Sequence, residues 1–366
     1  MEQNGETLKL LKQIEKTGIP SIDCVIYRRG SCIFRYRSGY SDEAKTKPVD
    51  GSERYNLYSC SKVITCTAIM QLVEKDLIRL DDAVYEYLPE FRNMKKMADG
   101  RLEAVKTTMT IRHLLTMTAG LTYDTESENL RRGRRETGGR MPTREAMKFL
   151  ACDPLSFEPG ASWQYSLCHD VLAAVAEVVS GRRFGLLVKE KIFDPAGMKH
   201  STFLLPEDEL PGIAAQYCYD EQSGEYHPCG PQIQRYKLGS EYESGGAGCI
   251  STVDDYIAFL EALRSGEKLL RRDTLARMVC PQISRAAERA YVQFGNPLPG
   301  YSYGLGVRCP LPGSPVEDFG WGGAAGAYLA IIPSEEISLF YVQHVLSSPA
   351  RPLRKHLPEA LLRDLR

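Results

Sequence analysis

The stretch Ser59-Cys60-Ser61-Lys62 stands at the start of a run with helical periodicity. Apolar residues recur after it at spacings of mostly three and four, at Ile64, Ala68, Ile69, Leu72 and Val73. This spacing predicts a helix with one face against a core. A helix that begins near Ser59 brings Ser59 and Lys62, three residues apart, to the same face.

This pair of side chains suits covalent catalysis. A serine hydroxyl is a weak nucleophile until a base removes its proton, and a desolvated lysine amine can act as that base. The N–H groups at the start of a helix can bind negative charge that develops on a substrate oxygen. The S-x-x-K pattern is short, however, so an N-cap serine beside a solvated lysine is the alternative interpretation.

The composition is that of a folded chain of 366 residues, with 43% hydrophobic and 25% charged residues. This length favours two domains or one two-lobed unit. The net charge of −1 gives no reason to expect a nucleic acid or an anionic membrane as partner. The first residues lack the apolar run of a secretory signal, and no stretch approaches the length of a membrane span. Eleven scattered cysteines without metal-ligand spacing then indicate a reducing cytoplasm.

Strand patterns lie near both ends of the chain and helical patterns lie between them. This order predicts an α+β fold, in which an antiparallel sheet is built from both termini, flanked by helices, and interrupted by a mostly helical insertion. We expect residues 1–58 and 235–366 to form the sheet domain, residues 59–234 to form the helical domain, and the active site to lie in the cleft between them. Strands are predicted at 21–27, 32–36, 303–307, 328–332 and 337–342, and helices at 4–17, 111–117, 170–179, 253–263 and 353–365.

Two segments between these elements have unusual compositions. Residues 122–145 lack apolar periodicity and contain six arginines, Arg131, Arg132, Arg134, Arg135, Arg140 and Arg144. They are interpreted as a solvated surface loop, with a mobile lid over an anionic substrate as the alternative. The glycines of Ser244-Gly245-Gly246-Ala247-Gly248 lack the lysine of a phosphate-binding loop and therefore favour a tight backbone crossing.

Taken together, the motifs resemble the serine β-lactamase and penicillin-binding-protein superfamily, in its class C β-lactamase and family VIII carboxylesterase branch. The matching stretches follow the order of that family over about residues 20–345. They are Ser59-Cys60-Ser61-Lys62, Thr110-Ile111-Arg112-His113-Leu114-Leu115, Gly120-Leu121, Pro159-Gly160, Tyr165-Ser166, Ser244-Gly245-Gly246-Ala247-Gly248 and Gly320-Trp321-Gly322-Gly323.

The resemblance implies a role for each matching residue. Ser59 would be the acylated nucleophile, and Lys62 and Tyr165 would take its proton and return one to the leaving group. A lysine ammonium close to a phenol lowers the pKa of the phenol, which would let Tyr165 act as a base. The backbone N–H groups of Ser59 and Ala324 would form the oxyanion hole. The resemblance implies no metal and no organic cofactor.

The sequence departs from the family pattern at two positions. Leu167 stands where the family has the Asn of its Tyr-x-Asn motif, and His169 nearby is the candidate for a replacement polar group. Trp321 stands where the family has the lysine of Lys-Thr-Gly, so recognition of a substrate carboxylate should be weaker. Trp321, Gly322, Gly323 and His169 are therefore the predicted substrate-binding residues.

We expect a serine hydrolase that cleaves small-molecule carboxylic esters through an acyl-Ser59 intermediate, with weak lactam hydrolysis or acyl transfer as related activities. A β-lactamase or D-amino-acid peptidase, acting on lactams or amides, is an alternative. A non-catalytic binding or sensory protein on the same fold is an alternative of another class. The natural substrate and the oligomeric state stay open.

Overall fold

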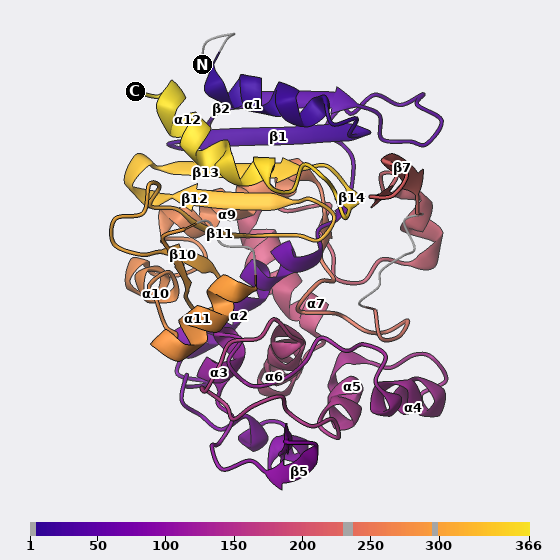
Figure 1. Ribbon diagram of the computed structural model, residues 1–366, viewed down its shortest axis with the longest axis vertical. Helices are drawn as coiled ribbons and strands as arrows, with labels where there is room; N and C mark the ends of the chain where they lie inside the picture. The colour runs from indigo at the N-terminus through magenta and orange to yellow at the C-terminus, as the bar shows by residue number, and fades with distance from the viewer. Residues whose placement is uncertain (1–4, 230–236, 295–298) are drawn as a thin grey trace.

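The computed structural model describes residues 5–229, 237–294 and 299–366. Its largest sheet has seven strands in the order β2-β1-β13-β12-β11-β10-β9, each antiparallel to its neighbours, and lies in the upper half of Figure 1. The strands are β1 (Ser21–Arg28), β2 (Ser31–Gly39), β9 (Tyr301–Tyr303), β10 (Arg308–Pro310), β11 (Phe319–Gly322), β12 (Tyr328–Ile332) and β13 (Ile337–Val342). The predicted antiparallel sheet built from both ends of the chain is confirmed.

The turns between these strands follow from their residues. Arg29 and Gly30 both have positive φ, 52° and 78°, as a two-residue hairpin turn between β1 and β2 requires. The prediction of a strand over residues 303–307 is wrong in extent, because β9 ends at Tyr303 and the chain turns toward β10. Gly306, with φ of 86°, lies in that turn.

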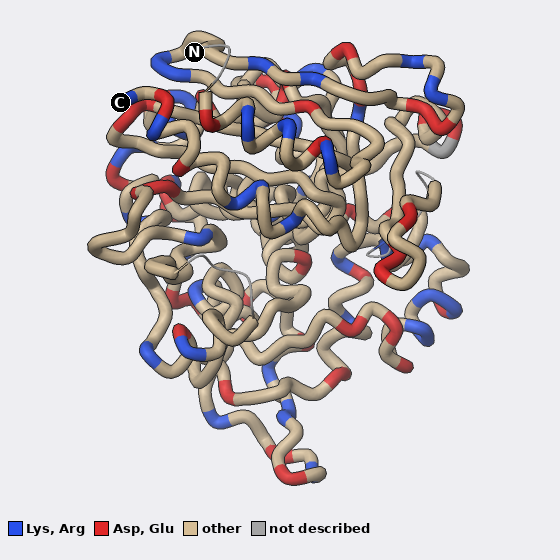
Figure 2. Tube along the Cα trace, turned by 45° about the horizontal axis from the view of Figure 1, so that its top comes forward, with Lys and Arg blue, Asp and Glu red and all other residues tan. Residues whose placement is uncertain are grey.

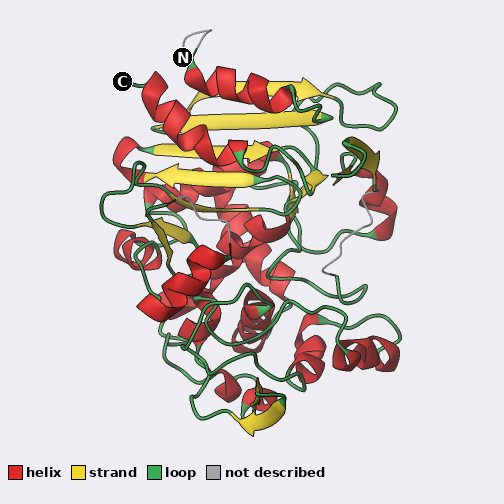
Figure 3. Cartoon of the chain, viewed as in Figure 1, coloured by secondary structure: helices red, strands yellow, loops and turns green. Residues whose placement is uncertain are grey.

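Helices cover both faces of the sheet, as Figure 3 shows in red over yellow. Along β1, Ile22, Cys24 and Ile26 face one side and pack with α1 (Glu6–Glu15) and α12 (Leu357–Asp364). Val25 faces the other side, where α9 (Val253–Ser265) packs against β1 and β13. This alternation is the period of two expected of a strand buried on both faces.

The remaining helices form the lower half of the molecule in Figure 1. Helix α2 (Ser61–Glu74) is buried on all sides from Ser61 to Met70, whereas the sequence predicted a single buried face. A helix that is apolar all round belongs at the centre of a fold. Helix α2 packs against α6 (Cys168–Ser180), α7 (Phe184–Val188) and α10 (Arg272–Met278). The other helices outside the sheet layers are α3 (Ile111–Leu115), α4 (Glu128–Glu136), α5 (Thr143–Leu150), α8 (Asp194–Ala196) and α11 (Arg285–Gln293).

Short strands join distant parts of the chain. The pair of β3 (Tyr55–Asn56) with β8 (Ile250–Ser251) fixes the residues just before Ser59 beside those that follow the glycine-rich segment 244–248. Two smaller sheets contain β4 (Lys95–Ala98) with β5 (Arg101–Ala104), and β14 (Val345–Leu346) with β6 (Tyr217–Asp220) and β7 (Glu225–Pro228). The predicted domain boundary between residues 234 and 235 lies outside the described residues.

The prediction of a loop over residues 122–145 is wrong. The segment contains helix α4, which begins where the Ser127 hydroxyl accepts a hydrogen bond from the Leu130 N–H, and the start of α5. A side chain at Gly133 would lie 2.6 Å from the Phe149 ring, so this glycine lets α4 pack closely on α5. The helix was missed because Leu130 is its one large buried apolar residue.

Five of the six arginines of this segment are paired with acids. Arg131 and Arg134 contact Glu126, Arg132 contacts Glu136, Arg135 contacts Glu128, and Arg144 contacts Glu90. Basic and acidic residues are interspersed along the whole trace in Figure 2. Within the described ranges, no helix is both long enough and apolar enough to cross a membrane.

Candidate active site

Ser59 lies on a 3-10 turn, η1 (Tyr58–Cys60), immediately before α2. Tyr58 has a positive φ of 48°, a conformation that a non-glycine residue adopts only when its surroundings hold it there. The Tyr58 hydroxyl donates to Gln216 Oε1 at 2.8 Å, and the Ser61 hydroxyl donates to the Tyr58 carbonyl at 2.5 Å. These bonds fix the turn that carries Ser59.

Lys62 is completely buried and its ammonium points at the serine. Nζ lies 3.3 Å from Ser59 Oγ and donates a shorter hydrogen bond, 2.7 Å, to the Gly246 carbonyl. The same ammonium lies 4.6 Å from the centre of the Tyr165 ring. The three-residue separation, from η1 into the first turn of α2, therefore brings Lys62 to Ser59 as the sequence spacing predicted.

Tyr165 reaches the serine from the segment just before α6. Its Oη donates to Ser59 Oγ at 2.5 Å, so one oxygen receives hydrogen bonds from both Lys62 and Tyr165. Parallel rings hold the phenol in place: Tyr123 stacks on it at 5.4 Å and Trp321 at 5.9 Å between ring centres. The structure thus brings together all three residues that the sequence singled out for chemistry.

The glycine-rich segment 244–248 crosses α6 at close range. A side chain at Gly245 would collide with the backbone of His169, and one at Gly246 would lie 2.6 Å from Asp170 Oδ2. The segment thus requires glycine at these positions, as the predicted tight crossing implied, and the crossing lets the Gly246 carbonyl reach Lys62.

Asp170 was missed by the sequence analysis. It is fully buried in the first turn of α6, and its Oδ1 accepts hydrogen bonds from Ser244 Oγ at 2.6 Å and Tyr242 Oη at 2.7 Å. Burial raises the pKa of Asp170, and the Ser244 hydroxyl and the Lys62 ammonium oppose that rise. Its position in the sequence could have revealed it. An acid directly before the apolar run 171–176 becomes buried together with that run, and a buried carboxylate requires hydrogen-bond partners.

The segment Trp321-Gly322-Gly323 ends β11 beside the Ser59 turn. Trp321 is 9% exposed and stacks on Tyr165, with Tyr303 edge-on to it at 5.2 Å. A side chain at Gly323 would collide with the carbonyl of Leu57, two residues before Ser59. Neither the Ser59 N–H nor the Ala324 N–H donates to an acceptor within the described part of the chain.

His169 does not lie where a substrate could reach it, so the prediction that it binds substrate is corrected. Its side chain is completely buried in α6, and Nε2 lies 3.1 Å from Cys66 Sγ. Burial holds the pKa of His169 well below its usual value, so the ring is neutral. Leu167 is buried as well, at 1% exposure, and its N–H donates to the Thr122 carbonyl.

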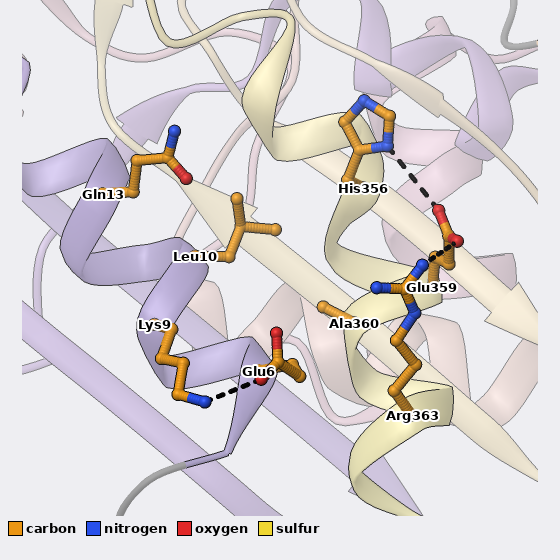
Figure 4. A pocket seen from close by; sticks show the side chains of 8 residues that line it. All are labelled: Glu6, Lys9, Leu10, Gln13, His356, Glu359, Ala360 and Arg363. Carbon is orange, nitrogen blue, oxygen red and sulfur yellow. Dashed lines mark hydrogen bonds and ion pairs between the residues drawn. The ribbon is translucent and has the colours of Figure 1, made fainter.

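A hollow of about 280 Å³ lies elsewhere, between α1 and α12 (Figure 4). Its charged side chains pair with one another, Lys9 with Glu6 and Arg363 with Glu359, each at 2.7 Å. Among the described residues, its lining contains no serine, threonine or cysteine, so it offers no hydroxyl or thiol nucleophile.

The arrangement of Ser59, Lys62 and Tyr165 agrees with the comparison of the whole chain with known proteins. A family model described as Beta-lactamase matches residues 8–361. The chain belongs to the β-lactamase family. Esterase EstB from Burkholderia gladioli is 30% identical over 339 residues, which cover 82% of this chain and 80% of EstB.

Two other similar proteins have acyl transfer in their descriptions. Acyltransferase calJ from Penicillium decumbens is 29% identical over 73% of this chain and 70% of its own. The structure of EstCE1, described as a hydrolase with promiscuous acyltransferase activity, superposes with a TM-score of 0.79 at 26% identity, over 97% of this chain and 98% of EstCE1. The chain is accordingly an enzyme of the serine hydrolase or acyltransferase type.

Proposed function

We propose that the chain is a serine esterase that cleaves carboxylic esters through an acyl-Ser59 intermediate. The observation that carries this proposal is the convergence of Lys62 Nζ and Tyr165 Oη on Ser59 Oγ, at 3.3 Å and 2.5 Å. A hydroxyl between an amine and a phenol has a base within reach for its proton and an acid that can return one.

The reaction has two steps. Ser59 Oγ attacks the ester carbonyl while its proton passes to the Tyr165 and Lys62 pair, and the collapse of the tetrahedral adduct breaks the carbon–oxygen bond to the alcohol. The pair returns the proton to the departing alkoxide. Water then attacks the acyl-enzyme, giving up a proton to the same pair, and the carboxylic acid leaves as Ser59 recovers its hydrogen.

The negative charge of the tetrahedral adduct needs donors that are already in place. The backbone N–H groups of Ser59 and Ala324 have no acceptor among the described residues and supply this oxyanion hole in our proposal. Gly323 brings the second donor close, because its backbone packs against Leu57, just ahead of the Ser59 turn.

Trp321 favours uncharged substrates. Its indole offers ring area and one N–H but no positive charge, so a substrate carboxylate finds no ion pair at this position. This argues for neutral esters, with Trp321, Gly322 and Gly323 beside the substrate, and against efficient β-lactam or D-amino-acid peptide hydrolysis. Acyl transfer to an alcohol or amine is the second candidate, because calJ and EstCE1 carry that activity in their descriptions.

The test uses p-nitrophenyl acetate, butyrate and octanoate, with nitrocefin in parallel and mass spectrometry of the protein. We expect ester turnover and an acyl adduct on the wild type and neither on Ser59→Ala. Ser265→Ala is the matched control, because the Ser265 hydroxyl lies at the end of α9 and bonds the Ala262 carbonyl instead of the catalytic pair. It should retain the adduct.

Each other outcome has a defined meaning. Nitrocefin hydrolysis faster than ester hydrolysis would replace the esterase by a β-lactamase. A rise in p-nitrophenol release with added alcohol, together with a new ester, would favour acyl transfer. Absence of turnover and adduct on every substrate would favour a non-catalytic binding protein and overturn the proposal.

A further inference from the structure

We infer that Arg354, a buried arginine that does not touch Ser59, Lys62 or Tyr165, positions the Gly323–Ala324 peptide for oxyanion binding. This inference rests on the proposed function, because it concerns one donor of the proposed oxyanion hole. It assigns Arg354 the role of a positioning residue, acting through the peptide rather than on the substrate.

Arg354 is enclosed by the protein. It lies on the short 3-10 helix η7 (Leu353–His356), and it is 2% exposed. Its Nη2 donates to the Gly323 carbonyl at 3.3 Å, while its guanidinium carbon lies 6.0 Å from the centre of the Tyr328 ring. A side chain at Gly322 would come within 3.1 Å of Nη2, so the glycine leaves room for the guanidinium.

The cost of this burial argues for a role beyond stability. Nε and Nη1 of Arg354 have no hydrogen-bond partner among the described residues, and no carboxylate of that set is among the groups that act on the guanidinium charge. Burial lowers the pKa of Arg354 to about 10, so the group is still charged at neutral pH. A buried charge without a counter-charge is less favourable than an apolar side chain of similar volume.

The planar peptide bond between Gly323 and Ala324 links the bond at the carbonyl to the direction of the N–H. The C=O of Gly323 and the N–H of Ala324 belong to one rigid planar unit and point in opposite directions. Arg354 therefore holds the carbonyl end on one side, and the free N–H points away from it. A charged donor on the carbonyl also polarises the amide and makes its N–H a stronger donor.

The Ser59 turn also lies beside this peptide. Gly323 packs against the Leu57 carbonyl, and Ala324 packs against the cluster of Tyr58, Ala325 and Leu346. The peptide thus contacts both Arg354 and the residues that precede the nucleophile.

The test compares Arg354→Met with the wild type and with Lys355→Met, a neighbour on the same 3-10 helix that makes no hydrogen bond to Gly323. We expect kcat for p-nitrophenyl butyrate to fall about tenfold in Arg354→Met, with KM little changed. The reason is that the bond from Arg354 to the Gly323 carbonyl strengthens the hydrogen bond from the Ala324 N–H to the oxyanion, which is made only in the transition state. Lys355→Met should keep the wild-type kcat, and Arg354→Met should unfold at no lower urea concentration than the wild type.

A spectroscopic measurement separates positioning from general packing. In an acyl-enzyme labelled with ¹³C at the carbonyl, the C=O stretching frequency falls as oxyanion-hole hydrogen bonds strengthen. We expect a higher frequency in Arg354→Met than in the wild type. If that variant is too unstable to purify, Arg354→Gln takes its place, with a shorter and uncharged donor. It should show the same fall in kcat and the same rise in the carbonyl stretching frequency.

The outcomes distinguish this inference from the proposed function. A wild type that forms no acyl adduct would overturn the proposed function and this inference with it. A wild type that is acylated normally, beside an Arg354 variant with unchanged kcat and carbonyl frequency, would overturn this inference alone.

Discussion

The Lys62 ammonium is bonded more closely to the carbonyl of Gly246, at 2.7 Å, than to the hydroxyl of Ser59, at 3.3 Å. The position of the lysine therefore depends on a segment 184 residues further along the chain. Asp170 holds that segment through Ser244, so a buried acid that touches no substrate sets the geometry of the nucleophile.

Lys62→Met should abolish most acylation without unfolding the protein. Methionine fills similar space but carries no amine, so we expect acylation by p-nitrophenyl butyrate to slow by about 10²–10⁴-fold. The free energy of unfolding should fall by about 1–3 kcal/mol, because the buried Gly246 carbonyl loses its hydrogen-bond donor. Stopped-flow release of p-nitrophenol and urea unfolding measure the two quantities. Lys75→Met, at the exposed end of the same helix, is the control, and normal acylation in Lys62→Met would refute the assignment.

Tyr165→Phe removes the hydroxyl that lies 2.5 Å from Ser59 Oγ and keeps the ring stacked on Tyr123 and Trp321. We expect kcat to fall by about 10²–10⁴-fold, with a change of about 1 kcal/mol or less in unfolding free energy. Steady-state kinetics and urea unfolding test both. Tyr226→Phe, which loses a bond to the Thr17 carbonyl, should keep full activity. Activity within about twofold of wild type in Tyr165→Phe would leave Lys62 as the sole base.

The stability of the protein should fall in mild acid because of His344. This ring is fully buried, accepts a hydrogen bond from the Asn56 N–H at 3.2 Å, and has its pKa lowered by burial from 6.5 to about 4. His344 binds a proton more readily in the unfolded chain than in the native state. The part of the unfolding free energy that depends on a neutral His344 is therefore present above pH 6.5 and is lost as the pH falls toward 4. The loss amounts to about 2 kcal/mol between pH 7 and pH 5.

Urea unfolding of the wild type, His344→Gln and His227→Gln at these two pH values tests this expectation. His344→Gln should show a smaller difference between pH 7 and pH 5. His227 is half exposed, so its replacement should leave the difference unchanged. An equal pH dependence in all three proteins would mean that other groups cause the acid sensitivity.

The arginines of α4 should contribute little to catalysis. Arg131 and Arg135 are exposed and paired with Glu126 and Glu128, so their charge is already balanced and screened. Arg131→Gln and Arg135→Gln should change kcat/KM by less than about twofold, both for a neutral ester and for an ester that bears a carboxylate. A selective loss with the carboxylate-bearing ester would restore the interpretation of this segment as an anion-binding lid.

Local patterns were sufficient for helices such as α3, α6 and α9 and for the long strands β1, β2, β12 and β13 of the large sheet. Thr110 and Thr252 cap α3 and α9 through their hydroxyls, directly before the two helix starts that the sequence predicted, because an N-cap needs only residues a few positions apart. Gly181 ends α6 with φ of 67°, a left-handed conformation that glycine adopts readily because it has no side chain. Helix α4 was missed because its stability depends on Gly133 packing against Phe149, a contact between two helices.

The sequence by itself determined the order of sheet and helices and the pairing of Ser59 with Lys62, because strand alternation and a one-turn helical spacing are properties of neighbouring residues. Tertiary structure alone decided which polar residues lie together. It buried His169 against Cys66 and placed Asp170 beneath the glycine-rich segment. It also brought Arg354 to the Gly323 carbonyl. These contacts join residues between 31 and 103 positions apart, and they form only when helices and sheet pack against one another.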